Sequence, residues 1–136
     1  MKFELDLGAR SPIIRSYGTG EFVVGDQRYH ASLVLSGDIL STELLPAGIE
    51  LLDDSHLDAL CALGTDLLLI GSGGRSRFLP QPLLARVLAR GIGCEVMTTA
   101  AACRSYNVLV AEGRSVTAAL FVIDPDRDQS PTHTGN

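Results

Sequence analysis

The second half of the chain alternates strand-like and helix-like segments, and this alternation constrains the fold more than any other feature. Two helical segments separate the strands: one opens at Pro80, where proline is tolerated in a first turn, and one is capped by Thr98 or Thr99. Helices that join successive strands favour parallel pairing with right-handed crossovers. The sequence therefore predicts a βαβαβ unit with helices packed on the sheet, its strands lying at residues 66–70, 94–97 and 115–123. The first and third of these are apolar enough to be buried on both faces.

The first third of the chain is typical of antiparallel hairpins. Short apolar stretches alternate with glycine and aspartate turns through residues 11–35, whereas residues 37–52 are predicted to be irregular. A short helix is expected to start at a cap on Asp54 or Ser55 and to run to about Cys61. The predicted fold class is thus α/β with a mixed sheet, in which N-terminal antiparallel hairpins precede the βαβαβ unit.

The length of 136 residues fits one domain, which the patterns place at residues 1–123. Residues 124–136 carry Pro125 and Pro131 among polar residues and are expected to form a disordered C-terminal tail. A hydrophobic fraction of 46% with 20% charged residues is typical of a globular chain rather than a disordered one.

Apolar runs and the N-terminal residues bear on location. No apolar run in the sequence approaches the ~20 residues that span a bilayer. Glu4 and Asp6 near the N-terminus are unlike the basic start of a signal peptide or the arginine-rich pattern of a mitochondrial presequence. We therefore expect a cytoplasmic protein without a transmembrane segment. Its three cysteines are expected to be reduced core residues, because no C-x-x-C spacing occurs.

Charge is unevenly distributed along the chain. The segment from Arg75 to Arg114 contains six arginines and two glutamates, a net charge of +4, whereas the whole chain carries −5. The guanidinium fork suits carboxylates and phosphates better than the lysine ammonium does. Solvated helix faces would explain these arginines equally well. Because the chain is acidic overall, no nucleic-acid partner is expected.

A candidate anion site follows from the predicted topology. In open α/β sheets, ligands bind beyond the carboxyl ends of the strands, which here lead into a glycine loop and a helix start. Glycines permit close backbone approach, and a helix start offers unpaired N–H groups. The loop completes neither G-x-G-x-x-G nor a P-loop, so on its own a simple turn is favoured over ligand binding. The candidate residues for binding a carboxylate, a phosphate or an acidic side chain are Gly71, Ser72, Gly73, Gly74, Arg75, Arg77, Thr98, Thr99 and Arg104.

No catalytic machinery is predicted. Cys103 lies in the first turn of a helix, where a thiolate is stabilised, but none of the three histidines falls in the basic segment to act as its base. We therefore expect Cys103 in the core, with no catalytic residues, no metal and no cofactor. Two polar pairs each allow two interpretations. Arg86 and Arg90 could bind an acidic partner or form internal salt bridges, and Arg104 with Asn107 could line a cleft or fix neighbouring loops.

Several short motifs are spread along the chain, of which the run from Ala101 to Leu109 is the most specific. The set comprises YGTGEF at 17–22, LLIGSG at 68–73, FLP at 78–80, GIGCEVM at 91–97, AACRSYNVL at 101–109 and EGR at 112–114. With these motifs the chain resembles a small single-domain family of long-unassigned function that includes the mitochondrial complex I (NADH:ubiquinone oxidoreductase) assembly factor 3. Ser72 and Ser105 stand where threonine is common in that family, and Cys94 where an aliphatic residue is common.

The resemblance implies a compact α/β domain with a mixed sheet, no established enzyme activity and no known cofactor. It also implies a protein partner, because the mitochondrial relatives act as assembly partners for complex I. The first hypothesis is therefore a non-catalytic binding or assembly domain whose basic Gly/Arg cleft faces an acidic partner or ligand. The expected partner is a respiratory-complex subunit or assembly factor, and a homodimer is a further expectation. The alternative is a small-anion (phosphate or carboxylate) binding protein, or an uncharacterised enzyme, that uses the Gly71–Arg77 loop and the Thr99 helix start.

Overall fold

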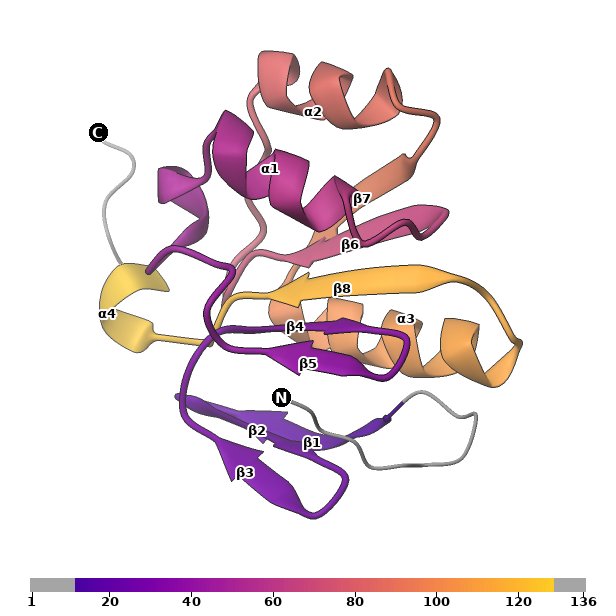
Figure 1. Cartoon of the computed structure of the whole chain (residues 1–136). Helices are drawn as coiled ribbons and strands as arrows, with labels where there is room; N and C mark the ends of the chain where they lie inside the picture. Colours follow the sequence, from indigo (N-terminus) through magenta and orange to yellow (C-terminus); the bar gives the residue numbers. More distant parts are fainter. Residues whose placement is uncertain (1–11, 129–136) are drawn as a thin grey trace.

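The computed structural model describes residues 12–128, which form two separate β-sheets (Figure 1). The smaller sheet is built from the N-terminal hairpins. Gly25 and Asp26 form the turn between its second and third strands. Its strands pair antiparallel in the order β1-β2-β3, with β1 at Ile14–Gly18, β2 at Glu21–Val24 and β3 at Gln27–Tyr29.

The larger sheet has five strands in the order β5-β4-β8-β6-β7. Strand β6 lies parallel to both β7 and β8, because helices carry the chain back between successive strands. Strand β4 pairs antiparallel with β8 on one side and with β5 on the other. The sheet is therefore mixed, which confirms the predicted fold class. Its strands are β4 (Leu33–Ser36), β5 (Ile39–Ser41), β6 (Leu67–Gly71), β7 (Gly93–Met97) and β8 (Val116–Leu120).

Helices lie on both faces of the larger sheet (Figure 1). Helices α1 and α2 pack on one face, and α3 packs on the other face together with the smaller sheet. The helical elements are the 3-10 turn η1 (Ile49–Leu51), α1 (Asp54–Cys61), α2 (Gln81–Leu88), α3 (Thr99–Ala111) and α4 (Pro125–Asp128).

Each face of the larger sheet has its own apolar core. Alternation along β6 places Leu68 and Ile70 in the cluster with α1 and α2, and Leu69 in the cluster with Tyr106 of α3. Strand β8 is buried at all five positions, as expected for a central strand covered on both sides. Burial of apolar surface at ~25 cal/mol per Å² is the main stabilising contribution of these two layers.

Polar caps set where the helices begin. The Thr98 side chain accepts an N–H of the first turn of α3, as the sequence predicts. Helix α1 is capped by Asp53, one residue before the predicted Asp54 or Ser55. The Asp53 carboxylate accepts the backbone N–H groups of Ser55 and His56, because its extended backbone directs the side chain toward them.

Two segments differ from the sequence expectations. Residues 39–41 form β5 inside the stretch predicted to be irregular, and this part of the expectation is wrong. Three residues beside a glycine turn carry too little periodicity to be recognised as a strand. In the segment expected to be a disordered tail, residues 125–128 form the one-turn helix α4, and residues 129–136 lie outside the described residues.

Candidate functional site

The glycine loop and the start of α3 lie at the same rim of the larger sheet. Gly71 ends β6, Met97 ends β7, and the two residues are register partners in the parallel pair. Two backbone hydrogen bonds join the loops that follow: the Ser72 N–H donates to the Met97 carbonyl at 2.7 Å, and the Thr99 N–H donates to the Gly73 carbonyl at 2.9 Å. The two loops that the sequence proposes as halves of one site are therefore adjacent.

Thr99 holds this junction together from the inside. Its side chain is fully buried, and its Oγ1 donates to the Phe121 carbonyl at 2.6 Å while accepting the Gly73 N–H at 2.8 Å. Gly71 allows the close approach, because a Cβ at this position would lie 2.9 Å from both Cα and Oγ1 of Thr99. The N–H groups of Gly73 and Thr99 are thus used within the chain.

An internal carboxylate lies on the outer side of the glycine loop. The Gly74 N–H donates to Oδ2 of Asp128 at 2.9 Å. The Arg75 guanidinium donates to the Asp128 carbonyl at 2.9 Å, and that of Arg77 to the Arg127 carbonyl at 3.3 Å. Gly73 has a φ of +105°, a conformation that favours glycine, and a Cβ there would approach the Asp128 carboxylate. Helix α4 therefore covers the loop with a carboxylate, the chemical group that the sequence proposes as its ligand.

Arg104 lies on another surface. Its guanidinium donates to the Tyr17 hydroxyl at 3.0 Å, which links α3 to β1. It also lines a groove with Glu95 and Arg114, beside β6 and β7. Asn107, one turn further along α3, donates to the Ile14 carbonyl and accepts the Ile14 N–H. Of the two interpretations of Arg104 and Asn107, these contacts favour fixation of a neighbouring segment.

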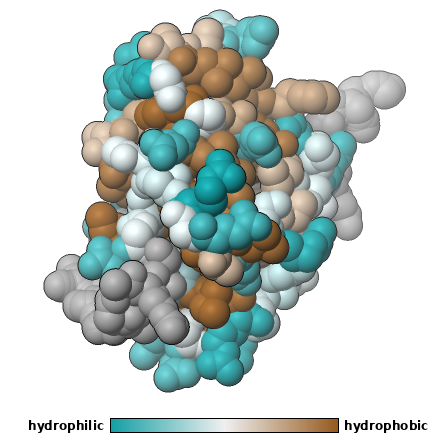
Figure 2. Space-filling view, turned by 90° about the vertical axis from the view of Figure 1, so that its right-hand side faces the viewer, coloured by the Kyte–Doolittle hydropathy of each residue, from teal (hydrophilic) through white to brown (hydrophobic). Residues whose placement is uncertain are grey.

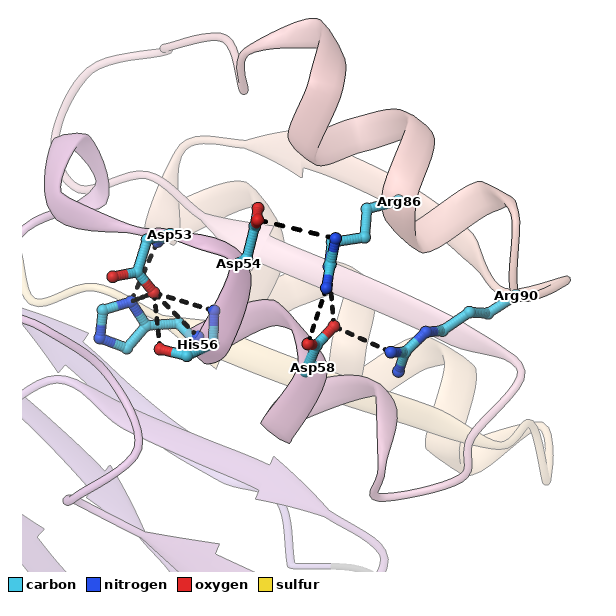
Figure 3. Close-up of polar contacts among 7 residues, drawn as sticks. Asp53, Asp54, His56, Asp58, Arg86 and Arg90 are labelled. Atoms are coloured by element: carbon cyan, nitrogen blue, oxygen red, sulfur yellow. Dashed lines mark hydrogen bonds and ion pairs between the residues drawn. The ribbon is translucent and has the colours of Figure 1, made fainter.

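Arg86 of α2 and Arg90, which follows that helix, form internal ion pairs (Figure 3). Arg86 donates to both carboxylate oxygens of Asp58, at 2.8 and 2.9 Å, and Arg90 donates to the same carboxylate at 2.8 Å. Asp54 lies 3.6 Å from the Arg86 guanidinium. The hydrogen bond from Arg86 lowers the pKa of Asp58, and the charges of Arg86 and Arg90 act in the same direction. Salt bridges between α1 and α2 thus account for this pair of arginines.

Cys94, Cys103 and His56 lack the features of reactive groups. Cys103 is buried, and burial raises the pKa of its thiol to about 12. Burial also raises the pKa of Cys94, to about 11. His56 takes part in the cap of α1, where its Nδ1 accepts the Asp53 N–H at 3.0 Å. Within residues 12–128, no group of three His, Cys, Asp or Glu side chains could hold a metal ion.

Neither Asp128 nor the exposed Phe78 is among the site residues predicted from the sequence. Phe78, in the loop after Arg77, is 96% exposed. Asp128 is 54 residues from Gly74 along the chain, and a single aspartate in a polar segment carries no signal of such a contact. Asp128 reaches the glycine loop only because the chain turns back at the end of β8.

The surface away from the glycine loop is mixed. Figure 2 shows the side on which β6 and β8 begin, and on this side several apolar patches are separated by hydrophilic residues. The part of the chain that the structure describes contains no helix with the length and hydropathy of a membrane span. The visible side therefore offers no broad continuous apolar face.

The architecture defines the class of protein: an α/β domain in which a mixed sheet lies between a helix pair on one face and a helix with a small second sheet on the other. The chain belongs to the family described as "Protein of unknown function (DUF498/DUF598)", which matches residues 14–121.

The family includes relatives with different names. An uncharacterized protein of Rhodobacter capsulatus is 37% identical over 110 residues, which cover 79% of this chain and 82% of that protein. A "13 kDa major membrane protein" of Francisella tularensis is 28% identical over 108 residues, 79% of this chain and 88% of that protein. The human NADH dehydrogenase (ubiquinone) 1 alpha subcomplex assembly factor 3 is 37% identical over 70 residues, 52% of this chain and 37% of that protein. These matches confirm the resemblance found from the motifs.

Solved structures have the same fold. An NMR structure of a protein from Xanthomonas campestris is 32% identical, covers 100% of this chain and 98% of its own, and has a TM-score of 0.76. A crystal structure of a Bordetella parapertussis protein is 29% identical, covers 85% of this chain and 98% of its own, and has a TM-score of 0.78.

Proposed function

We propose that this chain is a non-catalytic binding domain for protein assembly, whose Gly71–Arg77 loop receives a carboxylate of an acidic partner segment. The observation that carries the proposal is the Asp128 carboxylate, which accepts the Gly74 N–H at 2.9 Å. A charged acceptor on a backbone N–H forms a stronger hydrogen bond than a neutral one. A loop that holds an internal carboxylate has the donor that a partner's carboxylate needs. In the proposed complex, the partner segment replaces α4.

A partner segment that replaces α4 has to break only a few contacts. The helix has four residues, none of them buried, and so short a helix has little stability of its own. It is held by the loop contacts of Asp128, by the Arg77 hydrogen bond to the Arg127 carbonyl and by an ion pair between Arg127 and Glu50 on the 3-10 turn. Surface ion pairs contribute typically ~0–1 kcal/mol, so a partner segment with several carboxylates can compete.

The relatives indicate the class of partner. The human relative is named an assembly factor of an NADH dehydrogenase subcomplex, and its match covers about half of this chain. We therefore propose a respiratory-complex subunit or a second assembly factor as the protein partner. The cytoplasmic location expected from the sequence belongs to the same proposal, and fractionation of cells that express a tagged chain tests it.

A small anion is the second candidate ligand of the loop. The hydrogen bond from the Gly74 N–H to the Asp128 carboxylate favours it as well. Phosphate or a small carboxylate at the Gly74 N–H, between Arg75 and Arg77, would use the donors that Asp128 and its neighbour use in the free chain. Because Asp128 competes, Asp128→Ala is expected to bind such an anion more tightly than the wild-type chain. Thermal unfolding in the presence of phosphate and succinate measures this. At 100 times Kd the stabilisation is ~2.7 kcal/mol, and no stabilisation of either protein contradicts the candidate.

A genetic experiment tests the assembly function. The gene is deleted in the organism that encodes it, and the level and NADH:ubiquinone activity of complex I are measured. We expect both to fall, and to be restored by the wild-type chain but not by Arg75→Ala/Arg77→Ala. The matched control is Arg15→Ala/Arg28→Ala, which removes two exposed arginines of the smaller sheet. Unchanged complex I in the deletion strain, or full restoration by the loop variant, contradicts the proposal.

A further inference from the structure

A groove of about 410 Å³ lies between α3 and the edge of the larger sheet, away from the glycine loop. Its apolar lining includes Leu67 and Leu69 of β6 and Val108 of α3, and Val108 is 56% exposed. Glu95 is the register partner of Leu69, so both side chains stand on the α3 side of the sheet. The remaining lining residues are Arg104, Ser105, Leu109 and Arg114. We call this surface the α3–β7 groove.

The α3–β7 groove adjoins an open sheet edge. Strand β7 is the last strand in the order β5-β4-β8-β6-β7, so within residues 12–128 its outer side has no strand neighbour. Residues 93–97 contain no proline or lysine, and Glu95 is the one charged side chain on this edge strand. An edge of this kind, next to exposed apolar side chains, is suited to pairing with another strand.

The charges of the groove have both signs. Glu95, Arg104 and Arg114 line the same groove, and the Arg104 guanidinium donates to the Tyr17 hydroxyl. Neither Glu95 nor Arg114 has an ion-pair partner among the residues that the structure describes. A groove of one sign would fit a partner of the opposite sign. A groove that combines an unpaired carboxylate with an unpaired guanidinium is complementary to itself after a twofold rotation.

We propose that the α3–β7 groove is the interface through which two copies of this chain form a symmetric dimer. The β7 edges lie side by side, Glu95 of each copy pairs with Arg114 of the other, and Val108 is covered. A twofold interface forms each contact twice, so two ion pairs and a doubled apolar contact result. This inference is independent of the proposed function, because it uses another surface and another partner.

The test uses the purified full chain and measures its mass by light scattering and sedimentation over a range of concentrations. We expect a concentration-dependent dimer. Glu95→Arg and Arg114→Glu each place two like-charge contacts in the interface and are expected to raise the dimer dissociation constant about tenfold or more. Glu95→Arg/Arg114→Glu restores opposite charges and is expected to restore the dimer. Glu43→Arg, an exposed reversal elsewhere, is the matched control.

Hydrogen exchange locates the interface, and thermal unfolding checks that the variants are folded. Exchange of the β7 amides is expected to slow as the concentration of the wild-type chain rises, whereas the single reversals should remove this effect without loss of folding. A wild-type chain that stays monomeric up to ~100 μM, where interfaces of standard size are well populated, overturns the proposal. So does a dimer that the single reversals leave intact, or one that the double reversal does not recover.

Discussion

At the residue scale, Gly71 and Thr99 set how closely the glycine loop approaches α3. A Cβ at Gly71 would meet the backbone and side chain of Thr99 at 2.9 Å, whereas a Cβ at Gly18 would meet nothing within 4 Å. Gly71→Ala is therefore expected to destabilise the chain by ~1–3 kcal/mol through overpacking. Gly18→Ala, the matched control, should change the unfolding free energy by less than ~1 kcal/mol. Urea unfolding measures both, and equal effects would show that the close approach does not matter.

The rate at which Cys103 is alkylated shows whether its thiol is reactive in the folded chain. Burial raises its pKa to about 12, so very little thiolate exists at neutral pH. We expect native Cys103 to resist iodoacetamide and to react only after unfolding. Mass spectrometry of peptides from native and denatured protein measures this, with the half-buried Cys94 as an internal comparison. Alkylation of Cys103 at the same rate in both states would revive it as a candidate nucleophile.

The Asp58–Arg86 ion pair makes the stability of the fold depend on pH. Its pKa is lowered in the folded chain by the Arg86 hydrogen bond, so the pair stabilises the fold fully above the ordinary carboxyl pKa of ~3.9. This contribution is lost as the pH falls through that value toward the lower pKa of the folded chain. Asp58→Asn should therefore lower the unfolding free energy at neutral pH, and its difference from wild type should shrink below about pH 3. Asp38→Asn, in the β4–β5 turn, is the control, and a constant difference across this range contradicts the assignment.

At the element scale, the start of α3 is fixed by its cap. The Thr98 side chain accepts the Ala101 N–H at 3.2 Å, at the rim where the glycine loop meets the helix. Thr98→Ala is expected to lower stability by ~0.5–2 kcal/mol, and Thr98→Ser should retain most of it. Thr42→Ala, outside any helix or strand, is the comparison in the same denaturation experiment. Equal loss in both serine and alanine variants would assign the effect to the threonine methyl group instead.

Elements with a strong local pattern could be predicted from the sequence. The apolar run 66–70 and the cap on Thr98 are each determined by residues a few positions apart in the chain. The strand β5 could not be predicted, because its three residues carry too little periodicity to be recognised. The helix α4 could not be predicted, because it is held by contacts with the distant glycine loop. For the candidate site, the adjacency of the two loops followed from parallel topology. The separate place of Arg104 and the Asp128 carboxylate on Gly74 depend on side-chain positions that spacing does not determine.

At the scale of the whole molecule, α3 joins the two sheets. One face of α3 packs on the larger sheet through Ala102 and Cys103, and polar groups on the helix hold the smaller sheet. Asn107 makes two hydrogen bonds with the backbone of Ile14, and the buried Tyr106 hydroxyl donates to the Pro12 carbonyl at 2.8 Å. The smaller sheet is therefore held by α3 and by the segment after β8, where the Gly20 N–H donates to the Ile123 carbonyl at 2.8 Å. The larger sheet is held by its own strand pairing.

This arrangement predicts that the smaller sheet opens before the larger sheet when the contacts of α3 are weakened. Asn107→Ala removes both hydrogen bonds to β1 and leaves the partly buried Ile14 backbone groups without partners, which costs ~1–3 kcal/mol. We expect faster hydrogen exchange across β1, β2 and β3, with unchanged protection in β6 and β8, because regions with few buried contacts open independently of the central strands. Glu112→Ala, an exposed residue at the C-terminal end of the same helix, is the control. If Asn107→Ala accelerated exchange equally in both sheets, the two layers would unfold as one cooperative unit, and α3 would be part of a single core rather than the joint between two.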